Sequence, residues 1–165
     1  MVATVGSIAG GSDLVRAMRA LPAAAMGTLF AAALLIGACT TTPRVAFTAD
    51  AGVMSATEID ALASSADLGP VEGVDIEQAP DVRTDALVWL REQGAAGDRA
   101  ATLLTIGFPA RTAAVPLIVS VARVEGVQSL IVVEAFGGKS GPLSSRRLWV
   151  FDYKTGDLLR SASFR

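Results

Sequence analysis

The chain has 165 residues, no histidine, a single cysteine and a formal net charge of −2 at pH 7. Without histidine it cannot build a Ser-His-Asp triad, a Cys-His nucleophile pair or a histidine-based zinc site. A single cysteine excludes an intramolecular disulfide framework. The slight excess of acidic residues argues against a nucleic-acid partner, which would bind a basic surface.

The first 38 residues have the composition of an export signal. Arg16 and Arg19 precede an apolar run over residues 20–38, and polar residues follow at once. A basic segment, an apolar segment and small residues at the boundary are typical of a secretory signal peptide. Because a start at Met18 would place the basic segment directly before the apolar run, residues 1–17 can be explained as an extension from a misassigned start codon.

The boundary carries a more specific pattern, Ile36-Gly37-Ala38-Cys39. An aliphatic residue, two small residues and a cysteine in this order resemble the lipobox of bacterial lipoprotein precursors. The resemblance covers only the leader and the cleavage point. It implies that a signal peptidase cuts before Cys39 and that Cys39 carries lipid, including palmitate-type acyl chains. The exported protein would then be anchored to the outer face of the cell membrane or to the periplasmic leaflet.

Two other interpretations of this stretch stay open. Residues 20–38 approach the ~20 apolar residues that span a bilayer, so the stretch could be an uncleaved anchor. Cys39 could also be a buried structural cysteine, since free cysteine is usually a small buried hydrophobe. Pro22 and Gly27 make the run weakly hydrophobic, which favours a cleaved signal peptide over a membrane span.

Residues 39–165 are enough for one domain with its own core but not for two. Residues 39–52 are short and polar, contain Pro43 and show no sustained periodicity, so we expect them to be a lipidated tether. Residues 53–165 are then expected to form a single folded domain. No metal or cofactor is expected, because no motif for one occurs in this range.

Helices are expected in the first half of that domain. Ser55 and Glu58 form a capping box before a helix that ends near Ser65. A third helix is expected from Gly97 to Phe108. Between them, a second helix is expected to begin at the N-cap Asp81 and to end at Gly94. Its apolar face is expected to consist of Val82, Ala86, Trp89, Leu90 and Gln93, and Arg83 is expected to point away from that face.

Four antiparallel strands are expected after residue 114. Residues 115–124 and 127–136 flank Glu125-Gly126, a two-residue hairpin turn, and residues 146–153 and 158–164 form a second hairpin. Helices followed by strands indicate an α+β fold, with two or three short helices packed on a four-stranded meander. The hairpin register places Val119 opposite Val132, and it places Glu134 opposite Leu117.

Glu134 is the first candidate site residue, because it is the only acid in an otherwise apolar strand. It is either a functional acid or a structural one balanced by Lys139 or Arg146, and the structural interpretation is favoured. Trp149 is the second candidate, because it shares a strand face with Phe151. Such aromatic stripes are more often core than ligand platforms, so Trp149 is expected to be buried, as is Trp89 on the second helix.

Arg146 and Arg147 are the remaining candidate contacts. Residues 50–92 carry a charge of −8, whereas residues 93–165 carry +4. The acidic helical part is therefore expected to dock on the basic sheet. In the alternative, an exposed basic patch for anionic lipid or wall polymer is formed by Arg146, Arg147, Arg160 and Arg165.

Together these observations favour a membrane-anchored envelope lipoprotein that acts as a non-catalytic binding or accessory module. Its partner would be an envelope protein, a glycan or a lipid. The alternative is an envelope hydrolase that uses carboxylates without histidine, which would require a cleft presenting two such groups. Gly138-Lys139-Ser140 looks like the end of a phosphate-binding loop, but Val133 stands where its first glycine should be.

Overall fold

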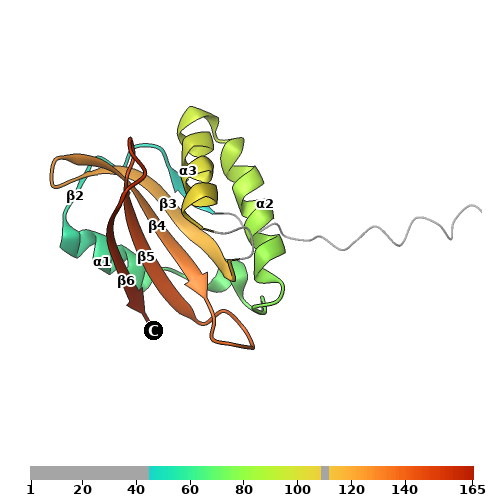
Figure 1. Ribbon diagram of the computed structural model, residues 1–165. Helices are drawn as coiled ribbons and strands as arrows, with labels where there is room; N and C mark the ends of the chain where they lie inside the picture. The colour runs from blue at the N-terminus through green and yellow to red at the C-terminus, as the bar shows by residue number, and fades with distance from the viewer. Residues whose placement is uncertain (1–44, 109–111) are drawn as a thin grey trace, which may run out of the picture. The chain divides into compact units, whose positions relative to one another are not determined.

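A six-stranded sheet forms the centre of the fold (Figure 1). The computed structural model describes residues 45–108 and 112–165, so the expected signal peptide and Cys39 lie outside the described residues. The strand order is β1-β3-β4-β5-β6, and β2 pairs with β3 beyond β1. The strands are β1 (Ala46–Thr48), β2 (Val53–Met54), β3 (Ala114–Val124), β4 (Val127–Phe136), β5 (Ser145–Asp152) and β6 (Leu158–Phe164).

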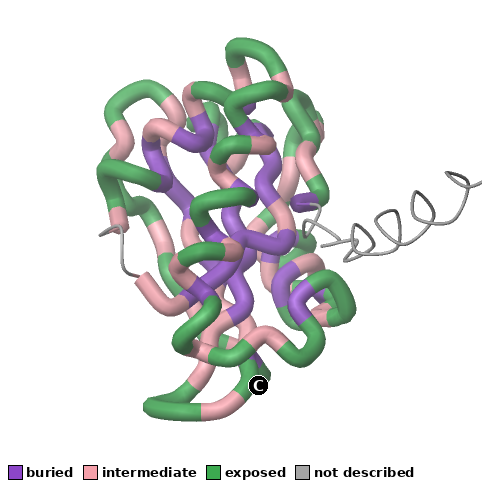
Figure 2. Tube along the Cα trace, turned by 90° about the vertical axis from the view of Figure 1, so that its right-hand side faces the viewer, coloured by how far each residue is buried: buried purple, intermediate pink, exposed green. Residues whose placement is uncertain are grey.

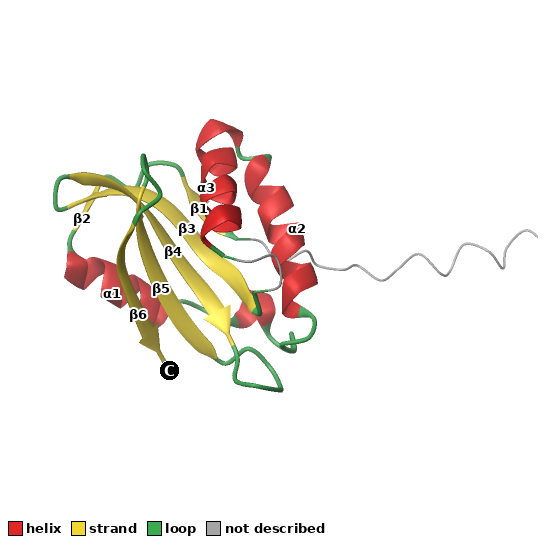
Figure 3. Ribbon diagram, in the orientation of Figure 1, coloured by secondary structure: helices red, strands yellow, loops and turns green. Residues whose placement is uncertain are grey.

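Helices cover both faces of this sheet (Figure 3). The helices are α1 (Ala56–Ser65), α2 (Ala79–Arg91) and α3 (Gly94–Gly107), with a 3-10 turn, η1 (Gly69–Val71). Ile59 and Ala63 of α1 pack with Ile131 and Val133 from one face of β4. On the other face of β4, Leu130 and Val132 pack with α2 and α3, through Ala86, Leu90 and Leu104 among others. Because both faces are covered, both sets of alternate residues in β4 are apolar.

The buried residues concentrate in the middle of the sheet (Figure 2). Neighbouring strands from β3 to β6 pair antiparallel, so the expected meander is present inside a larger, mostly antiparallel sheet. The two short strands β1 and β2 were not expected and run parallel to β3. Strand β1 falls within the range expected to be a tether, because three residues are too few to show an alternating pattern.

The central hairpin is formed as expected over most of its length. Glu125 and Gly126 both have positive φ, at 49° and 86°, as a tight hairpin turn requires. Val119 lies opposite Val132 as expected. Glu134, however, lies opposite Pro116, because a bulge between Pro116 and Ile118 shifts the register. The expected pairing of Glu134 with Leu117 is therefore wrong.

Two helices begin at other residues than expected. Helix α2 begins at Ala79, so Asp81 lies in its first turn and is not the N-cap. Pro80 explains the earlier start, since proline is favourable in the first turn of a helix. Helix α3 begins at Gly94, which has φ +78°. Gly97 instead allows a close approach of α3 to α2, because a Cβ there would lie 2.2 Å from the Leu90 carbonyl oxygen.

The capping box of α1 is formed as expected. The Ser55 Oγ accepts the Glu58 N–H at 3.3 Å, and Glu58 Oε2 accepts the Ser55 N–H at 2.7 Å. The Ser55 backbone N–H, and then its hydroxyl, hold the pKa of Glu58 below its ordinary value of 4.5. The ionised carboxylate therefore stabilises the folded state, since a hydrogen bond to the charged form favours that form.

We expect Ser55→Ala to lower the free energy of unfolding by about 0.5–2 kcal/mol. Glu58→Gln should lower stability at pH 6, and this difference from wild type should be lost as the pH falls from 4.5 through the lowered pKa of the folded-state Glu58 carboxyl. Urea unfolding across this pH range measures both effects. Ser64→Ala, at another exposed serine of α1, is the control, and an equal loss there would contradict the capping assignment.

Candidate functional site

A buried charge network crosses one face of the sheet. Glu134 of β4 points to the α2–α3 face and is 0% exposed. Arg83 of α2 is 2% exposed and forms an ion pair with Glu134 through Nη1 and Oε1. The same guanidinium donates to the Ala114 carbonyl at 3.1 Å and to the Leu104 carbonyl at 3.4 Å. Arg83 therefore joins α2 to α3, β3 and β4.

The second carboxylate oxygen of Glu134 also has donors. Its Oε2 accepts the Trp149 Nε1–H at 2.8 Å and contacts Arg147 Nη2 at 3.5 Å. The Arg147 guanidinium lies 4.6 Å from the Trp149 ring centroid and 5.1 Å from that of Phe136. These contacts have the geometry of cation–π interactions. They attach β5 to the same carboxylate that holds α2.

This network has the properties of a structural site. Both oxygens of Glu134 are occupied and the side chain has no exposure, so it has no open side for a reacting group. A buried carboxylate is tolerated only when it is paired and hydrogen-bonded, and here it is both. The interpretation of Glu134 as a structural acid holds, but its partners are Arg83 and Arg147, so the expected partners Lys139 and Arg146 are wrong.

The sequence candidates are divided between the two faces of the sheet. Glu134, Arg147 and Trp149 meet in the network, whereas Arg146 lies on the opposite face, where its Nε donates to the Ala66 carbonyl. Trp149 is half-buried. Trp89 is half-buried as well, and both indoles pack against the core beneath α2 and α3, where substantial burial of both was expected.

Arg83 is the network residue that sequence reasoning missed. It was expected to lie off the apolar face of its helix, yet the buried residues of α2 are Ala79, Arg83, Ala86 and Leu90. These spacings of four, three and four residues are those of one helix face. An arginine within that series, in a chain with one acid in a buried strand, was the available signal.

Most of the arginines that could have formed a basic patch are bonded within the domain. Arg160 of β6 contacts both oxygens of Asp60 in α1, at 2.8 and 2.6 Å. This pair joins the acidic helical part to the sheet, in agreement with the expected internal docking. Because Arg146 and Arg147 also have partners inside the domain, none of these three guanidinium groups is left fully available to an anionic surface.

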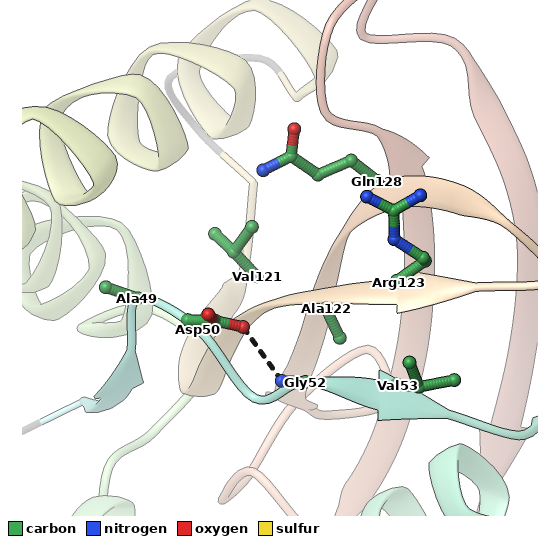
Figure 4. Close-up of a pocket in the computed structure, with 8 residues that line it drawn as sticks. All are labelled: Ala49, Asp50, Gly52, Val53, Val121, Ala122, Arg123 and Gln128. Atoms are coloured by element: carbon green, nitrogen blue, oxygen red, sulfur yellow. Dashed lines mark hydrogen bonds between the residues drawn. The ribbon is translucent and has the colours of Figure 1, made fainter.

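A second polar region lies open at the other end of the sheet, where β1 gives way to β2 (Figure 4). We call it the polar hollow. Its volume is about 360 Å³, and it is lined by Asp50, Gly52, Val121, Ala122, Arg123 and Gln128, among others. Val121 and Ala122 are both buried, and the Val121 side chain lies on the α2–α3 face of β3 whereas that of Ala122 lies on the α1 face. The three polar side chains come from the β1–β2 loop, from β3 and from β4.

An irregularity in the edge strand makes this hollow. Thr48 pairs with Ser120, and Val53 pairs with Arg123. The segment from β1 to β2 therefore advances five residues while β3 advances three. The residues between β1 and β2 therefore leave the regular pairing with β3, and the turn at Gly52 has φ +72°. The loop stays attached through the Ala51 N–H to the Val121 carbonyl at 2.8 Å and the Arg123 N–H to the Gly52 carbonyl at 2.7 Å. Bulges of this kind often re-aim side chains beside binding sites.

The charged groups of the polar hollow are not paired with each other. Asp50 Oδ1 accepts the Gly52 N–H at 2.9 Å, which fixes the carboxylate. Over residues 45–108 and 112–165, the side chain of Arg123 makes one long contact, from Nη1 to the Gly126 carbonyl at 3.4 Å. Within the described residues, no ion pair shorter than 4.0 Å joins Asp50 to Arg123. Unlike the Glu134 network, this region therefore leaves hydrogen-bonding capacity for a ligand.

A smaller cavity of about 170 Å³ lies between α2 and α3. The hydroxyls of Thr84 and Thr105 line it, but both donate to carbonyls of their own helices, at 2.9 and 2.7 Å. Arg83, which also lines it, is held by Glu134. The polar hollow is thus the better candidate for ligand binding.

Comparison with known proteins adds no family to this description. The chain matches no protein-family model, and no curated protein or solved structure is significantly similar to it. None of the helices over residues 45–108 and 112–165 is long and apolar enough to cross a bilayer. In the same ranges, no three acidic, cysteine or histidine side chains are grouped to hold a metal ion.

We expect Arg83→Met to lower the free energy of unfolding by about 3–5 kcal/mol, because it leaves Glu134 short of a buried partner. Glu134→Leu should lower the free energy of unfolding by a similar amount, since it leaves the buried Arg83 guanidinium without its carboxylate partner. The double variant should cost less than the sum by more than about 1 kcal/mol, as contacting residues are coupled. Urea unfolding of all four proteins measures this coupling.

Arg160→Met is the matched control for these variants. Its pair with Asp60 has side chains 37% and 39% exposed, so its loss should cost less than about 1 kcal/mol. Additive effects of Arg83→Met and Glu134→Leu, or a loss no larger than that of Arg160→Met, would contradict the structural role of the network.

Proposed function

We propose that this protein is an exported, lipid-anchored envelope protein whose α+β domain acts as a non-catalytic binding or accessory module. The observation that carries the proposal is the pattern Ile36-Gly37-Ala38-Cys39 after a basic and apolar leader. The pattern resembles a lipobox, and Cys39 is the only cysteine in the chain. The cysteine is thus where the lipoprotein pathway requires it.

The start of the folded domain adds a geometric consequence. Val45 is already buried at 3% exposure, and β1 begins at Ala46. Only residues 40–44 separate Val45 from Cys39. At 3.3–3.6 Å per residue, this connection reaches at most about 22 Å. A lipid on Cys39 would therefore hold the domain directly beside the bilayer, within reach of partners at the membrane surface.

The properties of the carboxylates favour a binding module over the alternative of a hydrolase. Glu134 was the acid with the best case for a catalytic role, and its oxygens are taken up by Arg83, Arg147 and Trp149. General acid catalysis needs a carboxyl group within hydrogen-bonding reach of the substrate. The polar hollow offers one carboxylate, Asp50, where a glycosidase mechanism uses two.

We place partner recognition in the polar hollow and not at the arginines of β5 and β6, because those arginines already bond to α1, to the residue that follows it and to Glu134. An envelope protein, glycan or lipid presenting polar groups could occupy it. The hollow is open to solvent, and among the described residues its charged groups make only one hydrogen bond at 2.9 Å and one contact at 3.4 Å.

Labelling with radioactive palmitate in a bacterial host that processes lipoproteins tests the anchor. Wild type should incorporate label, lose residues 1–38 and sediment with membranes, whereas Cys39→Ser should stay unlabelled and uncleaved. Stable anchoring requires two or three acyl chains, since one chain binds membranes only marginally. Thr41→Ala, which leaves the lipobox-like pattern intact, is the control and should behave as wild type.

Intact-mass measurement of the membrane fraction separates the alternatives. A mature protein beginning at an acylated Cys39 supports the proposal. An unlabelled wild-type protein that retains residues 20–38 and stays in the membrane as firmly as Cys39→Ser would instead identify an uncleaved anchor.

A further inference from the structure

We propose that the polar hollow binds a small zwitterion, with the cationic group of the ligand at Asp50 and its anionic group at Arg123. This inference deepens the binding role proposed above, but it does not depend on the lipid anchor. A free amino acid or a short peptide has the required chemistry. The ligand would bridge two opposite charges that line one hollow without contacting each other.

The carboxylate of Asp50 is fixed and only partly used. Its Oδ1 accepts the Gly52 N–H at 2.9 Å, and within residues 45–108 and 112–165 Oδ2 has no hydrogen-bond donor. The bulge between β1 and β2 sets this position, so the group is preorganised for a cation. An ammonium group at Oδ2 would form a charge-assisted hydrogen bond, which is about twice as strong as a neutral one.

The guanidinium of Arg123 stands on the neighbouring strand (Figure 4). Its contact with the Gly126 carbonyl at 3.4 Å uses one donor of the fork and leaves the others. A planar guanidinium can bind a carboxylate through two parallel hydrogen bonds. Gln128 lies opposite Arg123 in the strand pairing, and its side-chain amide has no partner among the described residues, so it can add a further hydrogen bond.

Size and charge narrow the ligand class. The hollow, at about 360 Å³, lies near the lower end of the ~300–1,000 Å³ usual for small-molecule sites, so it fits a small molecule or one or two residues of a longer chain. A nucleotide or another polyanion would be repelled by the negative charge of Asp50. A neutral ligand would leave both charges without counterions. Val121, on the same face of β3 as Arg123, offers apolar contact for the carbon skeleton between the two charged groups of a zwitterion.

Binding is measured by amide chemical shifts of the full chain carrying Cys39→Ser. The protein is kept in a non-ionic detergent, because a zwitterionic detergent would compete. The probes are glycine, β-alanine, 4-aminobutyrate, 6-aminohexanoate and alanylalanine, which differ in charge separation. We expect saturable shifts at Gly52, Arg123 and Gln128 with at least one probe. The N-acetylated and carboxamide forms of that probe should bind at least about tenfold more weakly, since each lacks one charged contact.

Two variants remove one charge each. Asp50→Asn keeps an acceptor for the Gly52 N–H, so the loop should stay folded, and Arg123→Gln removes the guanidinium. Each should raise the Kd at least about tenfold. The matched control is Asp67→Asn, because Asp67 Oδ1 accepts the Gly69 N–H at 2.9 Å in the same kind of turn outside the hollow. Arg165→Gln is the second control, and neither control should change the Kd.

Several results would overturn the proposal. Absence of saturable shifts with all five probes would do so, as would equal binding of the acetylated form. An unchanged Kd in Asp50→Asn, with loss in Arg123→Gln alone, would identify a simple anion site instead. Palmitate labelling of Cys39 does not involve the hollow. If no probe binds, the proposed lipid anchor on Cys39 is unaffected. If Cys39 is unlabelled but a probe binds, only the proposed lipid anchor is refuted.

Discussion

The carboxylate of Glu134 is the point on which the packing of this domain depends. It has no solvent contact, and its donors come from α2 and β5 through Arg83, Arg147 and Trp149. Arg83 also binds carbonyls of β3 and α3. Because an unpaired buried charge costs several kcal/mol, α2 can dock only where Arg83 reaches Glu134, and the Leu104 carbonyl of α3 accepts from the same guanidinium. Apolar surface drives this packing, and the network selects one arrangement of it.

This arrangement divides the domain into a closed part and an open part. Around Glu134, side chains of α2, β4 and β5 bond to one another and to backbone carbonyls of β3 and α3, and α2 and α3 cover this face. At the other end of β3, the edge chain bulges and leaves Asp50 and Arg123 on either side of the polar hollow. An arginine and a carboxylate therefore hold the fold together where they are in contact, as Arg83 and Glu134 are. Where they are kept apart, as Arg123 and Asp50 are, they remain available to a ligand.

Features that depend on residues close in sequence could be predicted from the sequence, whereas features that depend on distant residues could not. The capping box of Ser55 and Glu58 and the turn at Glu125-Gly126 are local, and both were predicted. The bulge at Leu117 and the short strand β1 depend on contacts distant in sequence, so no local pattern indicated them. Glu134 was identified because it interrupts an apolar strand. Its partner Arg83 lies 51 positions away, and Asp50 gained significance only from the position of Arg123.

Hydrogen exchange at the two indole N–H groups tests most directly whether the Glu134 network is closed in the folded protein. The Trp149 Nε1–H donates to Glu134 at 2.8 Å, whereas the half-buried Trp89 indole N–H has no hydrogen bond within the described residues. The account predicts that the Trp149 indole proton exchanges only when the whole domain unfolds. Its exchange rate should therefore fall as the free energy of unfolding rises. The Trp89 proton should exchange orders of magnitude faster. Equal, fast exchange at both indoles would contradict the central role of Glu134.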